Sequence, residues 1–229
     1  MRVSDLTKIA LPLALCLCLQ AQAPQTPPET APPKEPANEI KGMPPRAAPG
    51  DYQAHQLAGN VTIAAEFTQH SIATLEGTLT TEDYVVVEVG FFGPPGSHAT
   101  LSADAFTLRI NGKKPLPSQP YGLVVGNVKD PEWVPPESAS GEKSKTSLSS
   151  GGSGAGGLNN DPPPPVHVPF ELQRAMGLRV QKAALPGGDR PLPQAGLLFF
   201  RYGGQEKKIH SIELTYSGPG GKTTLTLQP

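Results

Sequence analysis

The sequence predicts an all-β fold: an antiparallel β-sandwich with a long insertion that carries one short helix. Two observations support this. Glycine and proline account for 25 and 28 of the 229 residues, far above average usage, and such a composition disfavours long helices. About eight short segments, separated by turn residues, alternate apolar and polar side chains with the period of a strand. Because each sheet must bury its apolar face against another layer, this pattern favours a sandwich.

The strongest strand is expected over residues 84–92. One face of it holds Val85, Val87, Val89 and Phe91, and the other holds Tyr84, Val86, Glu88 and Phe92. This period of two is typical of a half-buried strand. Further strands are expected at residues 61–68, 71–80, 105–110, 121–128, 195–202, 208–216 and 222–228, with the five-residue loop 217–221 joining the last two.

The sandwich, predicted over residues 59–229, is interrupted by an insertion at 129–193. Its middle, residues 137–165, has almost no apolar side chains and is expected to be disordered. After it, Leu172, Met176, Val180 and Ala184 recur every fourth residue. This spacing predicts one helix over residues 170–184, docked by that narrow stripe.

The first 23 residues have the pattern of a secretory signal peptide. Its parts are a basic start (Arg2 and Lys8), an apolar run (residues 9–19) and a small-residue exit (Ala21 and Ala23). A membrane span needs roughly 20 apolar residues, so this run is too short to be one. We therefore expect an extracytoplasmic protein, periplasmic or secreted, with no membrane span once the signal is removed.

Two details of export stay open. Pro24 makes cleavage after Ala23 a poor fit, so cleavage after Ala21 is the alternative. Cys16 and Cys18 each follow a leucine, where lipidation normally needs a small residue, and this disfavours a lipoprotein. The proline-rich stretch 24–58 is predicted to be a disordered spacer, because it has too little apolar surface to offset the entropy of ordering.

Composition excludes several functions. Both cysteines of the chain lie inside the signal peptide, so the mature protein is expected to have neither a disulfide nor thiol chemistry. The formal net charge is −1, which gives no electrostatic footprint for nucleic acid. The five histidines form no close ligand pair. We therefore predict no metal, no cofactor and no catalytic residue.

Two glycine motifs also lack the context that their chemistry requires. Residues 152–157 match G-x-G-x-x-G, but serine-rich sequence precedes them and Asn159-Asn160-Asp161-Pro162 follows, so we expect a linker. Gly221-Lys222-Thr223 is similar to the end of a phosphate-binding loop. However, Tyr216 stands at the position of the required glycine, so we expect a hairpin loop.

Three stretches resemble exported bacterial immunoglobulin-like domains of the immunoprotective extracellular protein type. They are residues 80–89, the strand and turn at 106–114, and the ending at 197–227. The whole mature chain is also similar to a group of uncharacterised exported bacterial proteins. The resemblance implies an immunoglobulin-like sandwich, and it brings no catalytic residues.

The function we expect is a non-enzymatic, immunoglobulin-like module that binds or scaffolds a partner in the cell envelope, either a protein or a glycan. Trp133, the only tryptophan, and Tyr121 are the candidate partner-binding residues, together with the insertion helix. Trp133 has an alternative role as a buried anchor of the insertion. Two other functions remain open: a glycan or small-molecule binding domain, and a hydrolase with a dispersed site.

Overall fold

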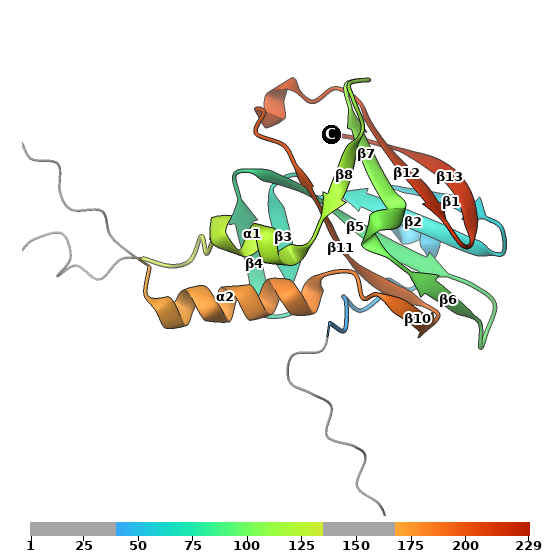
Figure 1. The fold of residues 1–229 in the computed structure, drawn as a ribbon, viewed down its shortest axis with the longest axis horizontal. Helices are drawn as coiled ribbons and strands as arrows, with labels where there is room; N and C mark the ends of the chain where they lie inside the picture. The colour runs from blue at the N-terminus through green and yellow to red at the C-terminus, as the bar shows by residue number, and fades with distance from the viewer. Residues whose placement is uncertain (1–39, 135–167) are drawn as a thin grey trace, which may run out of the picture. The chain divides into compact units, whose positions relative to one another are not determined.

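One curved antiparallel sheet of eight strands forms the body of the fold in this computed structural model (Figure 1). The structure describes residues 40–134 and 168–229, all of which belong to the compact unit 36–229. In spatial order the strands are β1 (Ala54–Ala58), β2 (Val61–Phe67), β5 (Tyr84–Phe92), β11 (Gln194–Arg201), β8 (Leu116–Gln119), β7 (Phe106–Ile110), β12 (Ile212–Gly218) and β13 (Gly221–Leu227). The predicted all-β class is confirmed.

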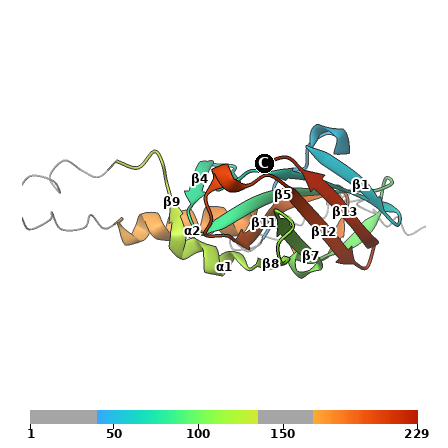
Figure 2. The same ribbon diagram turned by 90° about the horizontal axis from the view of Figure 1, so that it is seen from above.

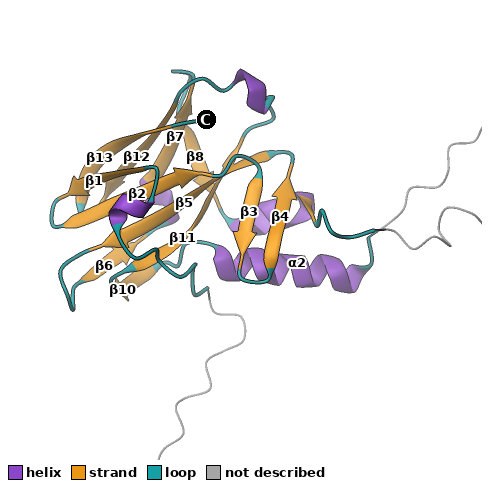
Figure 3. Ribbon diagram, turned by 180° about the vertical axis from the view of Figure 1, so that it is seen from behind, coloured by secondary structure: helices purple, strands orange, loops and turns teal. Residues whose placement is uncertain are grey.

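The sheet consists of two four-stranded halves. A ladder of only two residue pairs, Phe199 with Gln119 and Phe200 with Ser118, joins β11 of one half to β8 of the other. The outer strands β1 and β13 then lie side by side, so the sheet is nearly closed (Figures 1 and 3). Where the two end turns meet, a Cβ on Gly59 would lie 2.3 Å from a backbone oxygen, so the turn requires glycine.

The two halves face each other across the main hydrophobic core, which we call the inner core. Its members alternate along the strands as the sequence predicted, and they include Val85, Val87, Val89, Phe91, Phe106, Leu108, Ile110, Leu198, Phe200, Ile212, Leu214, Tyr216, Leu225 and Leu227. Phe91, Phe106 and Tyr216 pack ring against ring, with centroids 5.1 to 5.9 Å apart. Such contacts stabilise a core beyond the apolar area that they bury.

A second layer covers the opposite face of β5 and β11, which is also apolar. It contains α2 (Phe170–Ala183), α1 (Tyr121–Val124) and a small sheet of β3 (Ser71–Thr74), β4 (Gly77–Thr81) and β9 (Val128–Lys129), as Figure 3 shows for α2, β3 and β4. The residues between this layer and the sheet form the outer core: Ile72, Leu79, Tyr84, Val86, Val124, Val128, Met176, Val180, Ala183, Ala184, Leu197 and Phe199. Strand β5 is therefore buried on both faces, whereas the sequence predicted one.

The predicted insertion helix is confirmed as α2, and its stripe docks as expected. Met176, Val180 and Ala184 are buried, and Leu172 packs against the same cluster. After α2 the chain lies directly on β11, where a Cβ on Gly196 would stand 2.4 Å from the Cα of Leu185. It then forms β10 (Gly188–Pro191), which pairs with β6 (His98–Leu101). The insertion was predicted to span residues 129–193. Its last part, from residue 168 on, thus belongs to the folded body.

Two predicted strands are wrong. Residues 71–80 form a hairpin, β3–β4, rather than one strand, because the Thr74 hydroxyl donates to the Gly77 carbonyl (2.5 Å) and Gly77 adopts φ = 118°. Residues 121–128 form α1, a 3-10 turn and only then the two-residue strand β9. Pro120 precedes α1 with φ = −63°, a value suited to a helix start.

Two predicted segments, the spacer and the loop 217–221, also change their bounds. The spacer, placed at 24–58, is too long, since Tyr52 is buried, Met43 pairs with Ala195, and residues 54–58 form β1. The predicted loop 217–221 shrinks, because β12 and β13 extend to Gly218 and Gly221. The predicted signal peptide (residues 1–23), the first part of the spacer (24–39) and the expected disordered stretch 137–165 lie outside the described residues.

Candidate functional site

An apolar pocket of about 300 Å³ lies between Trp133 and the first half of α2. Its lining consists of Lys129, Asp130, Trp133, Val168, Leu172 and Met176. Figure 2 shows β9, α1 and α2 lying together around this region. Two residues of the stripe that docks α2, Leu172 and Met176, also line the pocket. Met176 is buried in the outer core, while Leu172 is only partly covered.

A tight turn after β9 places Trp133 at the pocket. The Trp133 amide donates to the Asp130 carbonyl (3.2 Å), and the Glu132 amide donates to the Asp130 carboxylate (3.0 Å). An Asp that binds the backbone two residues further along is a common way to fix a turn. Trp133 is therefore held half-buried rather than inserted into the outer core.

Asp130 is in turn fixed to α2 by Arg179. Arg179 Nη1 lies 3.2 Å from the Asp130 carboxylate, and the two side chains are only 12% and 16% exposed. The same guanidinium donates to the Thr74 hydroxyl (3.3 Å) and to the Glu76 carbonyl (3.2 Å). Arg179 thus ties the turn that carries Trp133 to both the helix and the β3–β4 hairpin.

A second, more polar hollow of about 350 Å³ adjoins the apolar pocket. The two share Lys129, Val168 and Met176, and the polar hollow adds Glu82, Asp83, Val125, Gly126, Asn127, Val128 and Gln173. We call the two hollows together the α2 groove. Lys129 Nζ lies 2.6 Å from the Glu82 carboxylate, and the hydrogen bond and charge of Lys129 lower the pKa of Glu82.

Apolar side chains are also exposed on the segments that border the groove. Leu123 in α1, Val134 beside Trp133, and Phe170 at the start of α2 are 55%, 77% and 73% exposed. Large apolar side chains gathered on neighbouring surface segments are typical of interaction sites. The groove and its borders therefore have the character of a binding surface.

The structure separates the two residues that the sequence singled out. Trp133 lines the groove against the insertion helix, whereas Tyr121 does not line it and packs half-buried against the outer core. Sequence reasoning missed Asp83, Asp130 and Gln173. The Asp130-Pro131 dipeptide was a usable turn signal for one of them, but only the fold brings residues 83 and 173 to the same hollow.

A third hollow, wide and open, surrounds His70 and bears on the hydrolase alternative. Its volume is about 660 Å³, and Glu82 and Glu206 are among its lining residues. His70 Nδ1 lies 2.6 Å from the Tyr84 carbonyl, which can only accept, so Nδ1 carries the proton. Nε2 lies 3.8 Å from Glu206, beyond hydrogen-bond distance. Neither contact of His70 is the close nucleophile–base pair of covalent hydrolytic catalysis.

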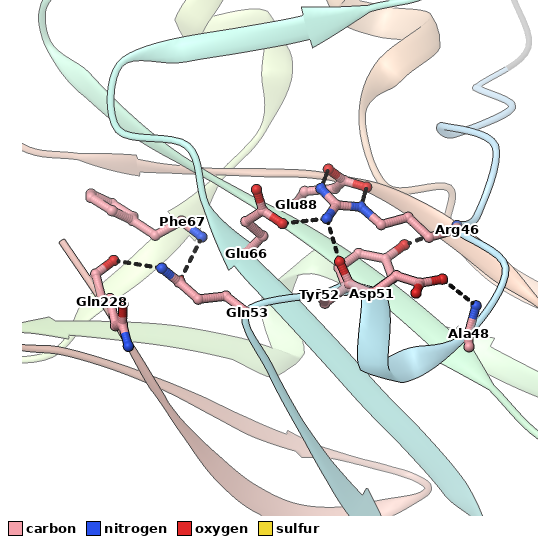
Figure 4. A network of polar contacts seen from close by, with 9 residues as sticks. All are labelled: Arg46, Ala48, Asp51, Tyr52, Gln53, Glu66, Phe67, Glu88 and Gln228. Carbon is pink, nitrogen blue, oxygen red and sulfur yellow. Dashed lines mark hydrogen bonds and ion pairs between the residues drawn. The ribbon is translucent and has the colours of Figure 1, made fainter.

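A network of polar contacts lies on the outer face of β2 and β5 (Figure 4). Arg46 donates to both Glu88 carboxylate oxygens (3.4 and 2.8 Å), to Glu66, and to the Asp51 carbonyl (2.7 Å), and its guanidinium lies 4.5 Å from the centre of the Tyr52 ring. Burial disfavours the charge of Arg46, but Glu88 and Glu66 outweigh this and raise its pKa. Because the guanidinium is already surrounded by partners, the network has a structural role: it fastens residues 43–53 to the sheet.

No helix within residues 40–134 or 168–229 is long and apolar enough to cross a membrane. Across the same residues, no three His, Cys, Asp or Glu side chains gather as metal ligands would. Comparison of the chain with protein-family models, curated proteins and solved structures found no match.

Proposed function

We propose that this protein is an exported, non-enzymatic binding module of the cell envelope, and that the α2 groove is its binding site. The observation that carries the proposal is the apolar pocket between Trp133 and α2. Ligand pockets are typically concave and mostly apolar, with a few polar groups that orient the ligand, and volumes of about 300 Å³ lie at the lower end of their range.

Two further features support this proposal. The groove is formed by an insertion and its neighbours on a rigid sheet, which is where binding surfaces are commonly placed. The exposed Leu123, Val134 and Phe170 extend the apolar surface beyond the pocket itself. A partner protein could cover such a border, whereas a small ligand held in the pocket would leave it in water.

Export and the immunoglobulin-like assignment belong to the same proposal. Export is supported by the signal-like first 23 residues. The immunoglobulin-like assignment is supported by two antiparallel half-sheets that enclose one core, an arrangement common to β-sandwiches. The short β11–β8 ladder links the two halves, and immunoglobulin domains do not require such a link.

Position-specific photocrosslinking tests the proposed binding site. A photoreactive residue at Gln173, which lines the groove, is compared with one at Thr224, which is exposed on β13. In envelope fractions we expect one discrete adduct from position 173, none from position 224, and loss of the adduct in a Trp133→Ala background. Equal labelling from both positions, or an adduct from position 173 that persists unchanged in the Trp133→Ala background, would contradict the proposal.

A further inference from the structure

The two hollows of the α2 groove differ in chemistry. The hollow beside Trp133 is lined mainly by apolar side chains, among them Leu172 and Met176. The adjoining hollow is lined by Glu82, Asp83 and several polar groups. Together their linings hold three carboxylates (Glu82, Asp83 and Asp130) and one ammonium group (Lys129). The groove therefore combines an apolar pocket with an excess of negatively charged side chains.

One of these carboxylates is available to a ligand. Glu82 is engaged by Lys129 (2.6 Å), and Asp130 is engaged by Arg179 (3.2 Å). Asp83 is exposed, and no ion pair joins it to another residue of the described chain. Its backbone is fixed, since the Asp83 carbonyl accepts from the Tyr202 amide (2.9 Å). A cation entering the polar hollow would thus meet a free carboxylate on a fixed backbone.

We propose that the α2 groove binds a segment of a partner protein that carries a large apolar side chain next to a lysine or arginine. The apolar side chain occupies the pocket against Trp133, and the cation lies beside Asp83. This inference rests on the proposed function and specifies its ligand. A pocket of about 300 Å³ has room for a large apolar side chain.

Charge and burial disfavour the other ligand classes. An acidic peptide or a phosphate would bring negative charge beside Asp83 and Glu82, and like charges at short range repel. A glycan would stack on an exposed aromatic face, but Trp133 is half-buried against α2. Electrostatic complementarity of this kind mainly sets which partner binds.

Trp133 itself provides the assay, because it is the only tryptophan of the chain. Its emission is followed in the full mature protein during titration with capped pentapeptides of sequence Gly-Gly-Phe-X-Gly, where X is Lys, Gln or Glu, and with Gly-Gly-Ala-Lys-Gly. We expect the Lys peptide to bind most tightly and the Gln peptide about two- to fivefold more weakly, the range for an exposed ion pair. The Glu peptide should bind more weakly still, and the Ala peptide should leave the emission unchanged.

A matched pair of variants then tests the position of the charge. Asp83→Asn should abolish the preference for Lys over Gln, as measured by the anisotropy of labelled peptides at low salt. Asp104→Asn removes the same charge from the exposed turn between β6 and β7, and should keep the preference. Retention of the preference in Asp83→Asn would contradict the assignment of the cation to that carboxylate.

The possible outcomes separate this inference from the proposed function. Equal binding of the Lys, Gln and Glu peptides would overturn the charge preference and leave the groove as an apolar binding site. No response to any phenylalanine peptide would overturn the whole inference. The photocrosslinking experiment at position 173 would still test the proposed function independently. An emission shift caused by protein concentration alone would assign the groove to a second copy of the chain and would also overturn the inference.

Discussion

The two faces of strand β11 support two different kinds of packing. Leu198 and Phe200 point into the inner core, while Leu197 and Phe199 point into the outer core, and all four are at most 2% exposed. The inner core is built chiefly from long strands that alternate regularly and interlock through aromatic rings. The layer over the outer core is assembled from two helices and three short strands that are far apart in sequence.

This difference shows how one sheet can be both a scaffold and a support for a binding surface. Apolar contact alone fills the inner core, whereas the elements over the outer core also need polar ties such as Arg179 to Asp130. The α2 groove lies on that second layer. Layers assembled from short elements leave hollows at their joints, and function is commonly placed on such elements above a rigid body.

The largest expected effect tests whether the two faces of β11 differ in rigidity. Leu198→Ala and Leu197→Ala delete equal side chains from adjacent, equally buried positions. Leucine-to-alanine changes in cores cost about 2–5 kcal/mol, with the lower values where the surroundings can collapse. We expect Leu198→Ala near the top of this range and Leu197→Ala near the bottom, as measured by urea unfolding. Equal costs would show that the outer core is as rigid as the inner one.

The Arg46 network is the next test, because it is a polar tie on the outer face of the same half-sheet. Arg46→Met leaves the Glu88 carboxylate, only 11% exposed, without its partner. Removing one member of a buried ion pair costs about 3–5 kcal/mol, and because Arg46 is partly exposed we expect about 2–3 kcal/mol. The double variant Arg46→Met/Glu88→Leu should regain more than half of the loss. Absence of this recovery would mean that packing of residues 43–53, rather than charge, carries the stability.

A smaller effect is expected at the tie that positions the groove. Arg179→Met removes the hydrogen bonds to Asp130, Thr74 and Glu76, and we expect a loss of about 1–2 kcal/mol. Emission of Trp133 should also shift to longer wavelength as its turn loosens. Lys182→Met is the control, because Lys182 pairs with exposed Glu76 (3.4 Å), and its loss should change neither quantity measurably. An unchanged Trp133 spectrum in Arg179→Met would show that the turn holds its own position.

Residues of the inner core could be predicted from the sequence because strand alternation is a local signal. The valines of β5 and the apolar residues of β7, β12 and β13 lie on the predicted faces. The stripe of α2 was equally readable, since Met176 and Val180 follow one helical face. In each case the residues that share a face are close in sequence.

Elements outside this local pattern could not be predicted. β1 lies within a proline-rich stretch whose average composition concealed Tyr52 and residues 54–58. The valines at 124, 125 and 128 indicated a strand, but Pro120 and the packing of Val124 against the outer core favour a helical turn. Such outcomes depend on tertiary contacts, which routinely override local propensity.

The candidate site likewise contains some residues that could be predicted from the sequence and others that could not. Trp133 was visible as the only tryptophan in an insertion, and α2 as a helix. Asp83, which follows β4, and Gln173, on α2, are 90 residues apart in numbering and meet only because both elements lie beside α1 and β9. No spacing rule in the sequence relates them. Their shared hollow is a property of the second layer.

The smallest effect concerns Tyr52 and is expected only in alkali. Burial raises the pKa of Tyr52 above its ordinary value of 10.0. The unfolded chain therefore loses this proton first, so the contribution of Tyr52 to the free energy of unfolding should be constant below about pH 10 and fall as the pH rises toward the folded-state pKa. In Tyr52→Phe the decline from pH 9 to 11 should be shallower than in the unsubstituted protein, as measured by urea unfolding at each pH. Tyr202→Phe, at a half-buried tyrosine directly after β11, is measured alongside as the control variant. An identical slope in both variants would mean that Tyr52 ionises as freely in the folded protein as in the unfolded chain. Residues 43–53 would then be packed only loosely against the outer face of the sheet, in contrast to the tightly packed inner core on the other face.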